Sequence, residues 1–344
     1  MIYIYFFLIA IAIFIVNNFL IKKNILPSHS GEKHQKFVEK KSIQLSGGIY
    51  LGFFFAVFFF THYKILSIFI LIILFLGLLT DKRIFKDPGI RFFFQLLTVL
   101  GIIYFYDLQI LSTRVLLFDQ FLEYKLFNYI FVCFCILIVI NGTNFIDGLN
   151  GLVLGYYLIV LSFLLINNFL TLPFYSDDKI VLFFYLLFLL YLFNLFNKLY
   201  LGDSGSYILG LIFSFIVINC YMLNQSVSPY YIILLLWYPC FENLFSILRK
   251  FRFNNSPIYP DQNHFHQLLF FFIKKNINGS NLLINNLSSL VINIFNLITL
   301  MIGSMDIYNT KLQLVLILCN ILIYVLMYIK LFNYRYKNIF KTIK

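Results

Sequence analysis

The stretch IFVCFCILIVINGTNFIDGLNGLVLGYYLIVLSFLL, residues 130–165, places a short polar segment between two long apolar runs. Asp147 is the only charged residue in this stretch. A helix needs about 20 mainly apolar residues to cross the hydrocarbon core of a bilayer. The stretch therefore predicts two transmembrane helices, which are joined at the polar segment NGTNFIDGLNGL, residues 141–152.

Apolar runs of this kind recur along the whole chain. Of its 344 residues, 61% are hydrophobic and 12% are charged, and the mean hydropathy is +0.89. A soluble domain typically has about 25% charged residues. We predict an all-α, polytopic transmembrane bundle that forms a single domain over residues 1–344. The spans number about eleven, or about ten if one of the short runs does not cross, and they are 2–21, 47–62, 65–79, 90–106, 127–141, 151–170, 180–197, 205–223, 230–248, 282–303 and 312–332.

The loops on the two sides of the predicted bundle differ in their content of Lys and Arg. All 26 of these residues, except Lys64, Arg114, Lys125, Lys179 and Lys311, lie in loops after odd-numbered spans or in the C-terminal tail. Loops rich in Lys and Arg stay in the cytoplasm. This distribution predicts a periplasmic N-terminus and a cytoplasmic C-terminus. The spread of basic residues over separate loops disfavours nucleic-acid binding.

The polar segment 141–152 repeats a polar side chain every three residues, at Asn141, Asn144, Asp147 and Asn150. Successive residues of a helix are about 100° apart, so a regular helix would fan these side chains over half its circumference. Three glycines in the segment permit a non-helical backbone, which is tolerated at membrane depth beside a cavity. We predict a polar loop that binds a ligand. A hydrogen-bonded contact between helices stays open as the alternative.

Two further stretches carry polar residues on the same predicted face. In LYLGDSGSYILG, residues 199–210, Asp203 lies between two glycines at the start of a span. A carboxylate in such a place suits Mg²⁺ that is shared with phosphate oxygens. In PIYPDQNHFHQLL, residues 257–269, His264 and His266 follow a basic segment that contains Arg249 and Lys250. These neighbours favour an anion site over a zinc site, which needs more ligands.

The order of these stretches resembles that in the polyprenyl-phosphate N-acetylhexosamine-1-phosphate transferases, the integral membrane glycosyltransferases of family 4. NGTNFIDGLNGL is similar to the family's Asn-x-x-Asn-x-x-Asp-Gly-x-Asp-Gly loop, and LGDSGSYILG is similar to its Gly-Asp-x-Gly-Ser loop. PCFENLFSILRK, residues 239–250, and the His-x-His loop resemble the branch that uses simple UDP-N-acetylhexosamines. SGGIYLG, residues 46–52, matches the Gly-Gly pair that opens the second span. The resemblance covers roughly residues 40–270.

The resemblance implies an enzyme of the bacterial inner membrane with a cytoplasmic active face. It implies transfer of an N-acetylhexosamine 1-phosphate from a UDP-sugar to polyprenyl (undecaprenyl) phosphate, with release of UMP, as the first step of a cell-envelope glycan. The cofactor implied is Mg²⁺, with Mn²⁺ as a substitute, and a homodimer stays open. The catalytic face would be built from the loops 80–91, 141–152, 198–206 and 249–281.

The resemblance also implies roles for individual residues. Asp203 would bind the metal ion, and Asp81 would orient or deprotonate the acceptor phosphate. The remaining catalytic residues would be Asp147, His264 and His266, and the substrate-binding residues would be Asn141, Asn144, Asn150, Arg91, Arg249 and Lys250.

Two positions depart from the family pattern. The family usually has a pair of Asp residues after its third span, whereas this chain has Thr80 and Asp81. The last Asp of the family's polar loop is Asn150 here. These departures leave open an altered or inactive family member, and a transporter of lipid-linked intermediates is the competing class. Transporters often show repeated halves, which this sequence does not show clearly.

Overall fold

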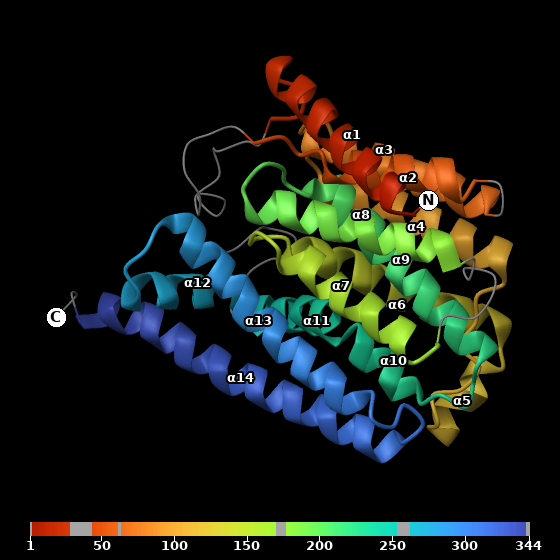
Figure 1. Ribbon diagram of the computed structural model, residues 1–344. Helices are drawn as coiled ribbons and strands as arrows, with labels where there is room; N and C mark the ends of the chain where they lie inside the picture. Colours follow the sequence, from red (N-terminus) through yellow and green to blue (C-terminus); the bar gives the residue numbers. More distant parts are fainter. Residues whose placement is uncertain (1, 28–42, 61–62, 170–176, 253–261, 342–344) are drawn as a thin grey trace.

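The computed structural model describes residues 2–27, 43–60, 63–169, 177–252 and 262–341 (Figure 1). Regular structure in these residues is helical, apart from isolated β-bridges that join Pro27 to Gln44 and Leu45 to Tyr200. The helices are α1 (Ile2–Lys22), α2 (Gly47–Phe58), α3 (Lys64–Asp81), α4 (Pro88–Tyr106), α5 (Leu116–Leu122), α6 (Lys125–Ile146), α7 (Leu152–Ile166), α8 (Asp177–Leu195), α9 (Gly202–Leu223), α10 (Pro229–Leu235), α11 (Trp237–Arg252), α12 (Phe265–Asn276), α13 (Asn281–Gly303) and α14 (Thr310–Lys341).

The helices confirm the predicted all-α transmembrane class. Within the described residues, 6 helices are long and apolar enough to cross a membrane, namely α3, α4, α6, α9, α13 and α14. The pair α10 and α11, bent by 78°, forms a further candidate span. Shorter apolar helices in α1, α2, α7 and α8 occupy the other predicted spans. The exact number of spans and the side of the membrane on which each terminus lies stay predictions.

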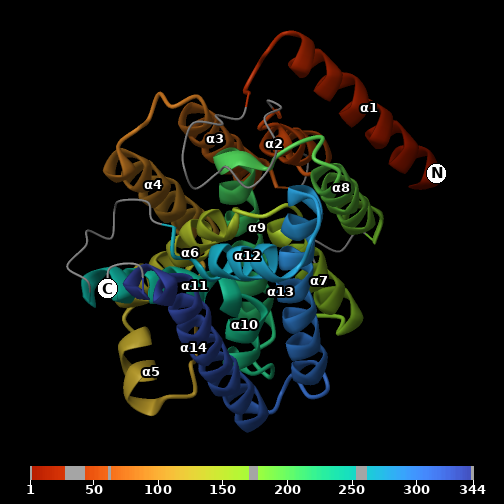
Figure 2. The ribbon, with the colours of Figure 1, turned by 90° about the vertical axis from the view of Figure 1, so that its left-hand side faces the viewer.

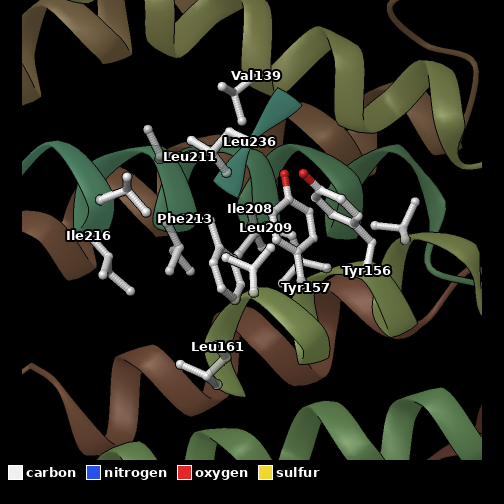
Figure 3. Packing of buried hydrophobic residues seen from close by; sticks show 14 of the residues in the cluster. Val139, Tyr156, Tyr157, Leu161, Ile208, Leu209, Leu211, Phe213, Ile216 and Leu236 are labelled. Carbon is white, nitrogen blue, oxygen red and sulfur yellow. The ribbon is translucent and has the colours of Figure 1, made fainter. Parts of the chain in front are cut away.

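The central element of the bundle is α9, which is surrounded by α2, α3 and α6 (Figure 2). Of the most apolar stretch of α9, 83% is buried inside the bundle. Figure 3 shows Phe213 of α9 packed against Tyr157 of α7, and their rings stack with centroids 4.3 Å apart. A helix buried on all sides needs mainly apolar side chains all round, which explains why α9 is mostly apolar after its first turn.

Glycines allow α2 and α3 to approach the first turn of α9 very closely. A Cβ atom on Gly77 of α3 would lie 2.2 Å from the Cα of Ser204, and one on Gly48 of α2 would lie 2.4 Å from the Ser204 Oγ. Small residues commonly permit such backbone contacts between membrane helices. The predicted Gly-Gly pair therefore serves the packing of α9.

The predicted continuous polar loop at 141–152 is wrong in its first half. The backbone of α6 stays helical to Ile146, and only residues 147–151 form the turn before α7. Gly151 has a φ of +73°, a conformation that glycine adopts without strain. The helix continues because its backbone hydrogen bonds hold the residues up to Ile146, while their polar side chains bond to neighbouring helices.

Two short helices lie where the sequence analysis predicted loops. Figure 1 shows α5 at one end of the bundle and α12 at the other, beside the C-terminal end of α14. The predicted loop 249–281 therefore includes the end of α11, all of α12 and the start of α13. Residues 253–261 of this loop, which include Pro257 and Pro260, lie outside the described residues.

Candidate active site

Three helices bring polar side chains together at Asp203, in the first turn of α9. The Nδ2 of Asn144, in the last turns of α6, donates to the Asp203 Oδ1 over 2.8 Å. The Nη1 of Arg91, in the first turn of α4, lies 3.6 Å from the Asp203 Oδ2. The side chains of Arg91 and Asp203 are 24% and 30% exposed. A polar cluster at the end of the bundle is therefore open to a ligand.

Asp81, the last residue of α3, fixes the start of α9. Its Oδ1 accepts a hydrogen bond from the Asp203 N–H at 2.8 Å, and its Oδ2 accepts from the Ser204 hydroxyl at 2.7 Å and the Ser204 N–H at 3.2 Å. These N–H groups have no partner within α9, so the Asp81 carboxylate, which belongs to α3, caps the N-terminus of α9. Asp81 thereby positions Asp203.

Two small residues accommodate this arrangement. Gly202 has a φ of +75°, and a Cβ atom there would lie 2.9 Å from the Asp81 Oδ2. Thr80 donates its hydroxyl to the Leu76 carbonyl within its own helix, at 3.0 Å. Thr80, which stands where the family usually has the first Asp of its pair, is thus hydrogen-bonded within α3.

Asp147 lies in the turn directly after α6, half-buried. Withdrawal of its carboxyl group from water raises the pKa of Asp147 well above its ordinary value. The negative charges of Asp203 and Asp81 raise it further. The three carboxyl groups therefore share one electrostatic environment.

The asparagines of the polar segment do not all point to this cluster. Asn141 donates through Nδ2 to the Gln95 Oε1 of α4, at 3.1 Å. The backbone N–H of Asn150 donates to the Asn285 Oδ1 of α13 at 2.7 Å, and its side chain contacts Asn197 at 3.4 Å. Their substrate-binding roles stay predictions, and the observed contacts of both residues join helices.

His264, at the start of α12, lies against a buried carboxylate. The Nδ1 of His264 is 3.0 Å from the Oε1 of Glu242, which is only 1% exposed. Glu242 also accepts from the N–H of Phe265 at 3.3 Å and from the hydroxyl of Tyr324 in α14. Because a carboxylate only accepts hydrogen bonds, this contact places a proton on the Nδ1 of His264.

His266 connects the histidines to the turn after α6. A Cβ atom on Gly148 would lie 2.2 Å from the Nε2 of His266, so this turn and the imidazole are in close contact. The rings of His264 and His266 stack with centroids 5.7 Å apart. Phe145 lies 5.4 Å from the ring of His264. The structure therefore brings both histidines to the end of α6 and the turn that contains Asp147.

Arg249 and Lys250, in the last turn of α11, are buried. The Nζ of Lys250 lies 5.9 Å from the centroid of the Phe145 ring, which also contacts His264. The Nη2 of Arg249 donates to the Ser246 hydroxyl at 3.2 Å. The two cations predicted to bind the substrate therefore lie at the same end of the bundle as the histidines.

The sequence analysis did not assign site roles to Glu242 and Tyr324. The sequence did contain a signal for Glu242, since an acid within an apolar segment needs a partner or a ligand to offset the cost of its charge. Tyr324 had no such signal, since it is one of 25 tyrosines in the chain. Its role depends on α14 packing against α11.

The oxygen donors of the cluster fit Mg²⁺. Within the described residues, no group of three or more His, Cys, Asp or Glu side chains is placed to hold a metal ion by itself. Mg²⁺ is usually bound through one or two carboxylates together with water and substrate phosphates. Asp203, with Asp147 sharing its electrostatic environment, provides such an incomplete set of hard oxygen donors.

Comparison with known proteins identifies the central helices. Residues 63–221 match the family model described as glycosyl transferase family 4. This segment is similar to glycosyl transferase family 4. It runs from the residue before α3 almost to the end of α9, and it contains Asp81, Arg91, Asn144, Asp147 and Asp203. The family resemblance expected from the sequence is confirmed.

A probable undecaprenyl-phosphate N-acetylglucosaminyl 1-phosphate transferase of Bacillus subtilis (strain 168) is similar to this chain. The two are 34% identical over 143 residues, which cover 39% of this chain. The chain spans 38% of the length of that relative in the alignment. The similarity supports the family assignment.

Proposed function

We propose that the protein transfers an N-acetylhexosamine 1-phosphate from a UDP-sugar to a polyprenyl phosphate. The observation that carries this proposal is the meeting of Arg91, Asn144 and Asp203 within the family 4 segment. An oxygen of the acceptor phosphate would attack the phosphorus atom next to the sugar. The bond between the two phosphates of the donor would break, and UMP would leave with its electron pair. The name of the relative makes UDP-N-acetylglucosamine and undecaprenyl phosphate the first substrates to test.

Arg91 and the three acids would perform different tasks at the phosphates. The guanidinium of Arg91, held beside Asp203, would bind the acceptor phosphate. Asp203 with Asp147 would hold Mg²⁺, which neutralises charge on the diphosphate when it is bound. The three hydrogen bonds of Asp81 to the start of α9 favour a positioning role. Deprotonation of the acceptor by Asp81 stays a prediction.

His264, His266, Arg249 and Lys250 would stabilise the negative charge that develops on the leaving phosphate. Preorganised donors are effective because they need no reorganisation when the charge forms. Glu242 orients His264 through its Nδ1, so the imidazole does not need to be fixed by the substrate. We propose that this end of the bundle faces the cytoplasm, as the distribution of Lys and Arg predicts.

Release of UMP tests the proposal directly. The purified full-length protein would be supplied with UDP-N-acetylglucosamine, undecaprenyl phosphate and Mg²⁺, and then with other UDP-N-acetylhexosamines. We expect UMP only when the lipid phosphate is present, together with a lipid-linked sugar. A transporter or an inactive family member would release no UMP from any of these donors, and that result would overturn the proposal.

A further inference from the structure

A basic cavity separate from the candidate active site lies between α12 and the end of α14. It has a volume of about 290 Å³ and opens at the surface of the bundle end that carries His264. Leu268, Phe271 and Phe272 of α12 form its apolar lining. The polar lining comes from Lys274 and Lys275 at the end of α12 and from Tyr334 and Arg335 of α14.

The cations of this cavity are held against aromatic rings. The Nζ of Lys275 lies 5.0 Å from the centroid of the Tyr334 ring, and the guanidinium carbon of Arg335 lies 4.2 Å from that of Phe271. The Nη1 of Arg335 also donates to the Gln262 carbonyl, which fixes the side chain. Among the described residues, none of Lys274, Lys275 and Arg335 forms an ion pair with a carboxylate. Their three positive charges therefore suit an anionic ligand.

The position of the cavity indicates what kind of anion it would bind. α14 presents exposed apolar side chains, including Leu326, Met327 and Ile329, about two turns before Arg335. Such a face contacts the acyl chains of a bilayer, so the basic cavity beyond it lies at the level of the headgroups. Basic residues with apolar stems and aromatic neighbours are typical of this level. The apolar lining would contact the glycerol and upper acyl chain, which a free phosphate lacks.

We propose that this cavity binds the phosphate of an anionic phospholipid headgroup. The bound lipid would contact both α12 and α14, beginning about one helical turn after His264. The hydroxyl groups of Tyr328 and Tyr336 already donate to the backbone carbonyl and side chain of Asn263, the residue before His264. The lipid would therefore add to contacts that position the start of α12. This inference does not depend on the proposed reaction.

Lipid binding to the full-length protein tests this inference. Native mass spectrometry would compare phosphatidylglycerol with phosphatidylcholine of the same acyl chains. We expect the wild type to retain phosphatidylglycerol selectively. The triple variant Lys274→Gln, Lys275→Gln, Arg335→Gln should lose roughly 100-fold in affinity, since each juxtamembrane cation contributes roughly fivefold. Lys275→Gln alone changes one exposed side chain and should lower the affinity for phosphatidylglycerol roughly fivefold.

Two control variants separate charge at this cavity from charge elsewhere. Lys274→Arg with Lys275→Arg preserves the charge and should retain phosphatidylglycerol. Lys22→Gln with Lys23→Gln removes two exposed lysines at the end of α1 and should leave binding unchanged. Wild-type affinity in both Lys275→Gln and the triple variant would overturn the proposal, as would an equal loss in the α1 variant. Displacement of phosphatidylglycerol by an equal concentration of inorganic phosphate would also overturn it, because the site would then bind free phosphate.

Discussion

At the scale of single residues, the candidate site depends on the charge of Asp203. Its Oδ1 accepts from Asn144, and its Oδ2 faces Arg91. Asp203→Asn keeps the size of the side chain and an oxygen for Asn144, but it removes the charge that Mg²⁺ and Arg91 require. We predict a loss of about 100-fold or more in kcat, measured as UMP release, because a placed charge partner in a closed site contributes on this order.

Asp306→Asn is the matched control for this change. Asp306 follows α13 at the other end of the bundle and accepts a local hydrogen bond from the N–H of Tyr308. Its replacement should leave kcat unchanged. Near-wild-type turnover by folded Asp203→Asn at limiting Mg²⁺ would exclude Asp203 as a metal ligand.

The hydroxyl of Tyr324 supports His264 through Glu242. Tyr324→Phe removes one hydrogen bond from the buried carboxylate but leaves the aromatic packing in place. We predict that kcat falls roughly tenfold with little change in KM, since a net hydrogen bond to a charged group contributes about 1.5–3 kcal/mol. Tyr104→Phe, at a tyrosine that is 74% exposed, is the control. A rise in KM at unchanged kcat would indicate a role in substrate binding.

The raised pKa of Asp147 gives a prediction for stability. Its ionised form is disfavoured by withdrawal from water and by Asp203 and Asp81. The folded carboxyl group therefore binds a proton at a pH where the unfolded one does not, and the wild type gains stability as the pH falls through that interval. In the absence of Mg²⁺, Asp147→Asn should unfold at a higher temperature than wild type at pH 8.

The difference between Asp147→Asn and wild type should shrink as the pH falls, because the wild-type carboxyl group becomes neutral as well. Thermal unfolding with a chelator present, measured between about pH 8 and about pH 5, checks this dependence. A lower unfolding temperature for the variant at pH 8 would mean that Asp147 has a stabilising partner in its ionised form. The same variant should release no UMP, since the site would lack a metal-binding charge.

At the scale of helices, the site depends on how closely α3 approaches α9. A Cβ atom on Gly77 would lie 2.2 Å from the backbone of Ser204, which cannot move aside as a flexible side chain would. Gly77→Ala must therefore push α3 away from α9 and pull Asp81 from the N–H groups that it caps. We predict a loss of stability of about 1–3 kcal/mol or more, as in other overpacked interiors, together with a loss of UMP release.

Gly279→Ala provides a control with the same chemical change. A Cβ atom there would lie 3.1 Å from the Leu283 Cδ2, the end of a flexible side chain. It should leave the unfolding temperature and the turnover close to wild type. If Gly77→Ala behaved in the same way, the close contact between α3 and α9 would not be needed to form the site.

At the scale of the whole molecule, the candidate site lies at one end of the bundle. The end that carries His264, Lys274 and Arg335 is opposite the end that carries α5 (Figure 1). The distribution of Lys and Arg predicts that the first end faces the cytoplasm. A fluorescent protein fused after Lys344 should therefore fluoresce, and alkaline phosphatase at the same position should be inactive. The reverse pattern would place the site where UDP-sugars do not reach it.

The sequence determined the class of the fold because span length and hydropathy are local properties. Every predicted span coincides with a helix or, for 230–248, with the bent pair α10 and α11. The short helices α5 and α12 escaped prediction because neither is long enough to cross a bilayer. The importance of Asp203 was also visible in the sequence, since an acid at a glycine-bounded span start requires a partner or a ligand.

The tertiary structure alone decided which polar residues meet. Asn141, Asn144 and Asn150 look equivalent in the sequence, yet Asn144 contacts Asp203 while the other two bond to α4 and α13. Asn141 and Asn144 lie three residues apart on α6 and so point in different directions, whereas Asn150 lies in the turn after the helix, and each one meets a different neighbour. The contact of Tyr324 with Glu242 likewise arises because α14 returns against α11 after 82 residues. Spacing along a chain does not encode such contacts, since they depend on the positions of whole helices.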